Sequence, residues 1–331
     1  MKKILPNEAF TSLRVLSLWF APLLAYPGEP LRIESSVDAM GSTFTIVVHA
    51  EDRNLLQAAV DLSFEEVRRL DNLLSNYKPR SEWSKINREA AQGPVRVSPE
   101  LFSLLAACVE YSRQSQGAFD ITVGPLVRTW GFYKGSGRLP HRAEIRSAMT
   151  KVGYRLLVLN AEDSTVRFAR PGMEIDPGGI GKGYAVDRVV EILRARGIRS
   201  AMVSAGGSSI YGLGAPPGEK GWKVELRHPQ QPSRHVGEVL LNNLSMSTSG
   251  TSEKFFVSGG RLYSHIFDPR TGHPAQGMLS VSVTAPRTID SEAWTKPMFI
   301  LGRQKAKRHL PPGFRAHFCE DRSNIPCAWL Q

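Results

Sequence analysis

The sequence predicts an α+β fold with mixed sheets and flanking helices. Segments with alternating apolar residues are interleaved with segments of helical periodicity, and their lengths are irregular rather than those of repeated βαβ units. The composition is that of an ordinary globular protein, since 41% of the 331 residues are hydrophobic and 22% are charged. We therefore expect residues 29–331 to form a single large domain.

Residues 1–28 are predicted to be a leader. Two lysines and Arg14 precede an apolar run at 15–25, which fits a signal-peptide h-region and is too short to span a bilayer. No clean A-x-A cleavage site follows and Glu8 lies in the charged region, so an N-terminal anchor or a buried helix remain alternatives. We expect an exported protein, periplasmic or associated with the cell envelope, with no spanning segment after leader cleavage.

The first part of the domain contains clear helix and strand signals. The β-branched, alternating segment 42–50 predicts a strand. Apolar residues at helical spacing predict an amphipathic helix over 54–74, and a serine cap with an acidic first turn predicts another over 98–115. Two short apolar stretches, at 154–160 and 173–176, predict strands.

The second part of the domain continues the mixture, and its strands outnumber its helices. Alternation predicts strands, and helical spacing predicts one helix near the middle and one near the end. The strands are expected at 200–206, 222–229, 235–243 and 278–286, and the helices at 183–196 and from 291 onward.

Charge and cysteine content limit the possible functions. The formal net charge of +11 is compatible with nucleic acid, an anionic membrane surface or phosphate-bearing ligands. Nucleic acid is a poor candidate, because the chain has no long basic block, helix-turn-helix or RNP-like string. Of the three cysteines, Cys108 sits in a helical pattern as a small core residue, and Cys319 and Cys327 could pair in an exported protein. No zinc-binding spacing occurs.

The glycine-rich string IDPGGIGKGYAVD, residues 175–187, is the first candidate for chemistry. It is neither a G-x-G-x-x-G fingerprint nor a P-loop, because Gly183 stands where a P-loop has serine or threonine. Glycines nevertheless let backbone N–H groups approach an anion, and the following helix adds a favourable dipole. A plain turn is the alternative.

Other strings combine turn residues with aromatic or acidic side chains. They are GAFDITVGPLVRTWGF at 117–132, SAGGSSIYGLG at 204–214, STSG at 247–250 and YSHIFDPRTGHP at 263–274. Each string alone is equally well explained by a strand end, a turn or a core tryptophan.

Taken in order, these strings resemble the flavin transferases of the ApbE type, which move FMN from FAD onto a protein. AMGSTFTI at 39–46 and LSNYKPRSEWSKIN at 74–87 complete the set, which extends over nearly all of the chain beyond the leader. The resemblance implies an ApbE-like, T-fold-related architecture of mixed sheets with flanking helices and with FAD in a cleft between two lobes.

The resemblance also implies which residues contact FAD. A flat ring needs apolar and aromatic walls with a few placed polar groups, and a diphosphate needs backbone N–H groups and a cation. The residues that match are Met40, Tyr77, Ala118, Phe119, Asp120, Asp176, Lys182 and Phe267.

A magnesium site is implied as well, and here the chain departs from the family pattern. The matching ligands are the Gly179 carbonyl, Glu292 and Thr295, but Lys296 stands where threonine is expected. Lysine supplies no oxygen ligand. An ammonium roughly 6 Å from Mg²⁺ would repel it by about 5 kcal/mol at an effective dielectric of ~20.

Three arrangements of Lys296 follow from this departure. The side chain points away while Glu292, Asp290 and waters complete a weakened site, or its ammonium takes the place of the metal. In the third arrangement it only pairs with Glu292 at i,i+4 spacing.

The implied activity is that of an FAD:protein FMN transferase. A threonine or serine hydroxyl of an acceptor, a redox or membrane protein, attacks the FMN-side phosphorus of FAD and AMP leaves. His265 or Asp268 could steer or deprotonate that hydroxyl. The alternatives are an FAD pyrophosphatase that yields FMN and AMP, and a non-catalytic FAD-binding protein that lost its metal site.

Overall fold

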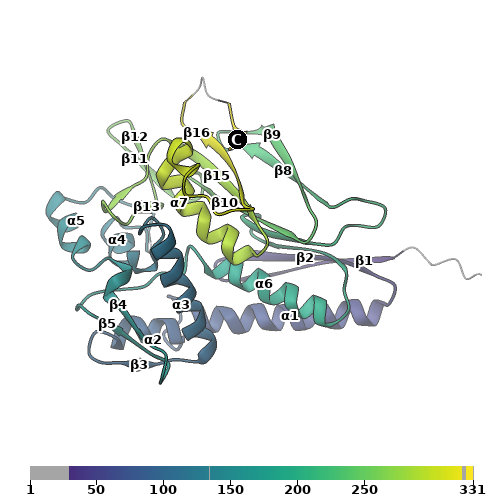
Figure 1. The fold of residues 1–331 in the computed structure, drawn as a ribbon, viewed down its shortest axis with the longest axis horizontal. Coiled ribbons are helices and arrows are strands. Elements are labelled where there is room, and N and C mark those ends of the chain that lie inside the picture. The colour runs from purple at the N-terminus through teal and green to yellow at the C-terminus, as the bar shows by residue number, and fades with distance from the viewer. Residues whose placement is uncertain (1–29, 134, 323–325, 331) are drawn as a thin grey trace, which may run out of the picture.

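The computed structural model describes residues 30–133, 135–322 and 326–330. The predicted leader lies outside the described residues. The frame is an eight-stranded sheet in which every neighbouring pair is antiparallel (Figure 1). Its order is β1 (Leu31–Ala39), β2 (Ser42–Ala50), β6 (Ser200–Ala205), β7 (Ser209–Leu213), β10 (Leu244–Gly250), β15 (Met278–Ala285), β16 (Arg315–Glu320) and β17 (Ala328–Trp329).

Three long helices pack on this sheet: α1 (Arg53–Leu74), α6 (Gly181–Ala195) and α7 (Thr288–Ala306). Figure 1 shows α1 and α6 side by side under β1 and β2. Alternation within β2 explains the layers. Phe44, Ile46 and Val48 face the core formed with α1 and α6. Val47 faces the opposite side and packs against the hairpin of β8 (Trp222–His228) and β9 (Gln231–Leu241).

A second lobe, at the left of Figure 1, contains the shorter helices and a small sheet. Its core is built around the fully buried Trp83 and Leu101. Ser98 is the N-cap of the helix at Pro99–Gln114, as the sequence predicts: its hydroxyl accepts a hydrogen bond from the Leu101 N–H. The elements are α2 (Glu82–Glu89), β3 (Val95–Arg96), α3 (Pro99–Gln114), η1 (Ile121–Val123), α4 (Gly124–Thr129), α5 (Arg142–Met149), η2 (Tyr154–Leu156), β4 (Leu157–Asn160) and β5 (Thr165–Phe168).

Two short hairpins lie between β10 and β15 in the chain order. They are β11 (Phe255–Ser258) with β12 (Arg261–Ser264), and β13 (Phe267–Asp268) with β14 (His273–Pro274). The predicted α+β class with several sheets and flanking helices is therefore confirmed, and every strand pair in the described residues is antiparallel.

The strand predictions differ from the structure in several places. Residues 154–156 of the strand expected at 154–160 form the 3-10 helix η2, and β5, β7, β10 and β16 were not predicted. Two further differences have a clear physical reason. Residues 173–176 form no strand: the Ile175 backbone is bound by side chains, since its carbonyl accepts from Trp83 Nε1 and its N–H donates to Asn87 Oδ1. Strand β1 was not predicted, because its residues alternate between exposed and half-buried positions at the sheet edge and are largely polar.

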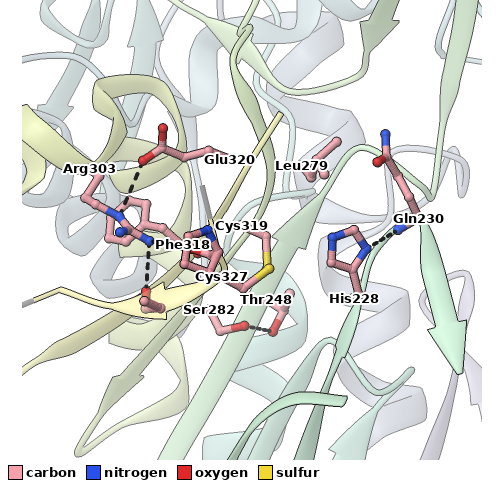
Figure 2. Close-up of a disulfide and its surroundings, with 12 residues drawn as sticks. His228, Gln230, Thr248, Leu279, Ser282, Arg303, Phe318, Cys319, Glu320 and Cys327 are labelled. Atoms are coloured by element: carbon pink, nitrogen blue, oxygen red, sulfur yellow. Dashed lines mark hydrogen bonds and ion pairs between the residues drawn. A yellow bond between two sulfur atoms is a disulfide. The ribbon is translucent and has the colours of Figure 1, made fainter. Parts of the chain in front are cut away.

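The C-terminal strands are fastened by a disulfide between Cys319 and Cys327 (Figure 2). Arg303 of α7 donates to the carbonyl of Phe318 in β16 at 3.3 Å and to that of Ala328 in β17 at 3.4 Å, so one side chain is hydrogen-bonded to both strands. Cys108 is fully buried in α3, where burial raises the pKa of its thiol well above its ordinary value.

Within the described residues, no helix has both the length and the apolar character needed to cross a bilayer.

Candidate functional site

A cavity of about 370 Å³ opens between the lobes. It is lined by the β1–β2 turn, the end of α1, the segment around η1, the glycine-rich string, the β11–β13 region and the inner face of α7. All residues that the resemblance assigns to FAD line it: Met40, Tyr77, Ala118, Phe119, Asp120, Asp176, Lys182 and Phe267. Gly179, His265, Glu292 and Lys296 line it too, whereas Thr295 and Asp268 do not.

One wall of the cavity is aromatic. Phe267 contacts Phe132, with ring centroids 6.0 Å apart, and Trp130 at 6.1 Å. Trp130 is held by its indole N–H, which donates to the Gly272 carbonyl. Phe132 also lines the cavity but was not among the predicted contacts, although it closes the string at 117–132. Such a wall suits a flat, conjugated ring.

Met40 is held over the cavity by an unusual turn. Both central residues of the β1–β2 hairpin have positive φ, 53° at Met40 and 68° at Gly41. This backbone is common for glycine and costly for methionine. The Met40 N–H donates to Asp71 Oδ1, which secures the turn. A Cβ at Gly181 would be 3.2 Å from Met40 Cε, so glycine there lets the methionine lie close to α6.

Tyr77 forms an exposed aromatic edge at the mouth of the cavity. Its side chain is largely exposed, yet it stacks on Tyr133 with centroids 5.2 Å apart, and its hydroxyl donates to the Tyr133 carbonyl. Arg128 lies 3.8 Å over the Tyr133 ring and supports the pair from behind. An aromatic side chain that is both exposed and held in place is suited to stacking on a ligand.

The two acidic residues of the cavity also organise its loops. Asp120 accepts hydrogen bonds from the Thr122 N–H and hydroxyl and from the Tyr154 N–H. Asp176 accepts from Asn76 Nδ2 and from the Gly178 N–H, which shapes the glycine turn. Burial raises the pKa of both carboxyls above their ordinary values, and these hydrogen bonds oppose the rise.

The start of α6 and the start of α7 cap each other. The Gly183 N–H of α6 donates to Glu292 Oε2 of α7, while Asp187 of α6 accepts from the Thr288 and Ile289 N–H groups of α7. Neither helix has a side-chain cap of its own at the N-cap residue. Each carboxylate satisfies free N–H groups and lies favourably in the dipole of the other helix.

Gly183 is needed for this contact rather than for binding phosphate. A Cβ there would lie 2.6 Å from the Thr288 carbonyl oxygen and 2.8 Å from Glu292 Oε2. This close helix–helix approach explains why the string lacks the serine or threonine of a P-loop. Lys182, one residue earlier, points toward the glycine-rich turn at 204–214, where its Nζ donates to Ser208 Oγ at 2.5 Å.

His265 and Asp268, the two predicted catalytic candidates, have different surroundings. His265 lines the cavity and its Nδ1 lies 3.1 Å from the Lys254 carbonyl, which can only accept, so Nδ1 is the protonated nitrogen. Burial lowers the pKa of His265, and the neutral ring then presents the Nε2 lone pair. Asp268 lies outside the lining, in a two-pronged ion pair with Arg270 at 2.8 and 2.9 Å.

The residues implied as magnesium ligands do not form a magnesium site. Thr295 is fully buried outside the cavity lining, and its hydroxyl donates to the Glu292 carbonyl and shares a hydrogen bond with Ser249. Glu292 is 2% exposed and already accepts from the Gly183 N–H. Asp290, the other oxygen donor considered, is bound to Arg287 and Tyr111. No group of three or more His, Cys, Asp or Glu side chains that could hold a metal occurs in the described part of the chain.

Lys296 lines the cavity in place of those oxygen donors. Its Cε lies 3.4 Å from the position of a Cβ on Gly179, so the side chain does not point away. Among the described residues its ammonium has no hydrogen-bond or ion-pair partner, which also excludes a direct pair with Glu292. Burial lowers the pKa of Lys296, an effect that the charges of Glu292, Glu253 and Asp176 oppose. The donor set of this chain therefore does not fit Mg²⁺.

These features define an α+β protein whose cavity has an aromatic wall for a flat ring and lysines beside a glycine turn for phosphate. A model of the ApbE family matches residues 40–317. The chain belongs to this family.

Relatives and solved structures agree with this assignment. The chain is 32% identical over 270 residues to the FAD:protein FMN transferase of Klebsiella pneumoniae (strain 342), covering 80% of this chain and 81% of that relative. It is 30% identical over 296 residues to the enzyme of the same name from Haemophilus influenzae, covering 86% and 85%.

Two crystal structures have the same fold. The ApbE protein of Thermotoga maritima superposes with a TM-score of 0.82 at 29% identity, covering 88% of this chain and 95% of that chain. The flavinyl transferase ApbE of Pseudomonas stutzeri, in its apo form, superposes with a TM-score of 0.80 at 27% identity, covering 91% and 94%.

Proposed function

We propose that this protein is an FAD:protein FMN transferase that attaches FMN through a phosphoester to a threonine or serine of an acceptor protein. The observation that carries the proposal is the cavity itself. Segments from residue 40 to residue 296 meet there, and the lining combines aromatic side chains with lysines. Relatives that match most of the chain bear the name of this activity.

The cavity suits FAD in two parts. Phe119, Phe267 and Met40 supply apolar surface for the flavin ring, and Tyr77 offers a stacking surface at the mouth. Lys182 and the turn at Gly178 and Gly179 supply a cation and closely approachable backbone for the diphosphate.

The reaction needs little covalent chemistry from the protein. The acceptor hydroxyl oxygen bonds to the FMN-side phosphorus, and the bond from that phosphorus to the bridging oxygen breaks. AMP leaves with the electron pair of that bond. Nε2 of His265 takes the hydroxyl proton, because Nδ1–H is held by the Lys254 carbonyl. Positioning and charge neutralisation supply most of the acceleration.

The acceptor is proposed to be a redox or membrane protein, and the transferase to work in the periplasm or elsewhere in the cell envelope. The disulfide between Cys319 and Cys327 supports an oxidising compartment. The apolar run at 15–25 supports export.

The test uses the purified protein, FAD and an acceptor protein with a flavinylation threonine, in parallel with Mg²⁺ and with EDTA. We expect AMP release and an acceptor heavier by one FMN in at least one condition. AMP with an unmodified acceptor would indicate FAD pyrophosphatase activity instead. FAD bound but intact in every sample would indicate a non-catalytic flavin-binding protein.

A variant tests the role of His265. His265→Gln should slow transfer by about 10²-fold or more, with FAD affinity little changed, since it removes the proton acceptor. The matched control is His235→Gln, whose imidazole lies on the surface of β9 beside Glu225. Equal rates for His265→Gln and the control would exclude His265 as the base.

A further inference from the structure

We infer that this transferase works without a divalent metal, and that Lys296 supplies the positive charge at the FAD diphosphate. The inference rests on the proposed function and concerns how its site neutralises charge. It starts from the side chains that line the cavity beside the glycine turn.

The first argument is that every candidate oxygen ligand is otherwise engaged. Glu292 accepts from the Gly183 N–H at the start of α6, and removing it from that bond would uncap the helix. Thr295 does not line the cavity, and its hydroxyl is hydrogen-bonded to Ser249 and to the Glu292 carbonyl. Asp290 is held by Arg287. Mg²⁺ is usually held by one or two protein carboxylates together with waters and substrate phosphates, and the Gly179 carbonyl supplies no carboxylate.

The second argument is the position of Lys296. Its stem passes over the glycine turn, with Cε 3.4 Å from where a Gly179 Cβ would stand. The ammonium is one bond beyond Cε, and Lys296 and Gly179 both line the cavity. A metal cation bound at the Gly179 carbonyl would be repelled by an ammonium this close to the glycine turn.

The third argument is that Lys296 lacks a partner until an anion binds. Within the part of the chain that the structure describes, its ammonium forms no hydrogen bond or ion pair. Glu253, Asp176 and Glu292 line the same cavity and stabilise a cation there without contacting it. A largely enclosed, unpaired cation beside a glycine turn is suited to a diphosphate oxygen.

Two lysines from different helices then face one ligand. Lys182 belongs to α6 and Lys296 to α7, and the reciprocal caps between these helices hold together the two helices that carry these side chains. As the acceptor oxygen bonds to phosphorus and AMP departs, negative charge builds on the bridging oxygen. Two ammonium groups stabilise that charge in the transition state.

The experiment compares the wild-type protein in EDTA and in Mg²⁺, and measures both FMN transfer and the Kd for FAD by flavin fluorescence. We expect transfer rates within about two-fold of each other and the same Kd in both conditions. Mn²⁺ titrated into the FAD-bound protein should show no bound fraction by electron paramagnetic resonance. Transfer that EDTA abolishes, or a Kd that Mg²⁺ lowers tenfold, would overturn the inference.

Variants of Lys296 give the second readout. Lys296→Met keeps the length of the stem and removes the charge, so FAD binding should weaken by about tenfold or more and metal-free transfer should fall by about 10²-fold or more. Lys296→Thr also removes the charge, and because Glu292, Thr295 and Asp290 keep their present partners, Mg²⁺ should not restore FAD binding. The matched control is Lys223→Met, since Lys223 is exposed on β8 and pairs with Glu238.

The outcomes separate this inference from the proposed function. If the wild-type protein transfers no FMN in either condition, the proposed function fails, and the Kd values still decide whether Lys296 or a metal provides the charge. If Lys296→Met melts like the wild type and binds FAD as tightly, the inference is refuted.

Discussion

Gly183→Ala provides a direct test of the contact that sets the separation of α6 and α7. The new Cβ would lie 2.6 Å from the Thr288 carbonyl oxygen and 2.9 Å from its carbon, both backbone atoms that cannot rotate away. The helices must separate by several tenths of an ångström, and overpacking of this kind costs about 1–3 kcal/mol. Alanine returns up to about 1 kcal/mol of helix propensity. Because the clash is with backbone atoms, the upper end of that cost applies, and the net expectation is a loss of about 2 kcal/mol.

Thermal unfolding followed by circular dichroism measures this loss. About 2 kcal/mol corresponds to a fall in Tm of about 4–8 °C for domains of ~150–250 residues, and the lower end applies to this chain of 331. FAD affinity should fall too, because α6 and α7 bear Lys182 and Lys296.

Gly93→Ala is the matched control, since a Cβ there has no atom within 4 Å and its backbone does not require glycine. It should leave Tm unchanged or raise it slightly. If the Gly183→Ala variant had the same Tm as the Gly93→Ala control, the reasoning about the α6–α7 contact would be refuted.

Two further predictions concern the reciprocal caps. Glu292→Ala should lower the free energy of unfolding by about 1–3 kcal/mol, because it leaves the Gly183 N–H without its acceptor. Glu292→Gln keeps an acceptor oxygen and should retain most of that stability. Equal Tm values for the two variants would contradict the capping role. Burial raises the pKa of Asp187 from 3.8 to about 6, so between these pH values the native protein binds more protons than the unfolded chain and its stability falls as pH rises. Asp187→Asn stays neutral, so the Tm of the wild type should decline relative to this variant between about pH 4 and 7; parallel curves would contradict the assignment.

Elements with a strong local pattern were predictable from the sequence. Strand β2 begins and ends where its alternation does, at Ser42 and Ala50, and α1 occupies Arg53–Leu74 as its apolar spacing indicates. In both elements the apolar residues recur at the spacing that puts them on one buried face, and this spacing can be seen in nearby residues of the sequence. The order of the glycine and aromatic strings was enough to indicate the family as well.

Elements that depend on distant partners were not predictable. Strand β1 has little apolar pattern because it lies at the sheet edge, and its pairing with β2 defines it. Residues 173–176 have the composition of a strand, but the backbone N–H and carbonyl of Ile175 are hydrogen-bonded to side chains of α2 instead of to another strand. Local composition cannot reveal a partner that lies elsewhere in the chain.

The sequence by itself determined the fold class, the chemical types available to the site and the lysine at position 296. Only the tertiary structure decided which of those side chains meet. Lys296 enters the cavity while Thr295, its neighbour, turns to Ser249, because consecutive residues of a helix point about 100° apart. Glu292 is drawn to the start of α6 by an N–H that only folding brings near. Helix spacing indicates which residues share a face, but the packing of α6 against α7 determines what that face contacts.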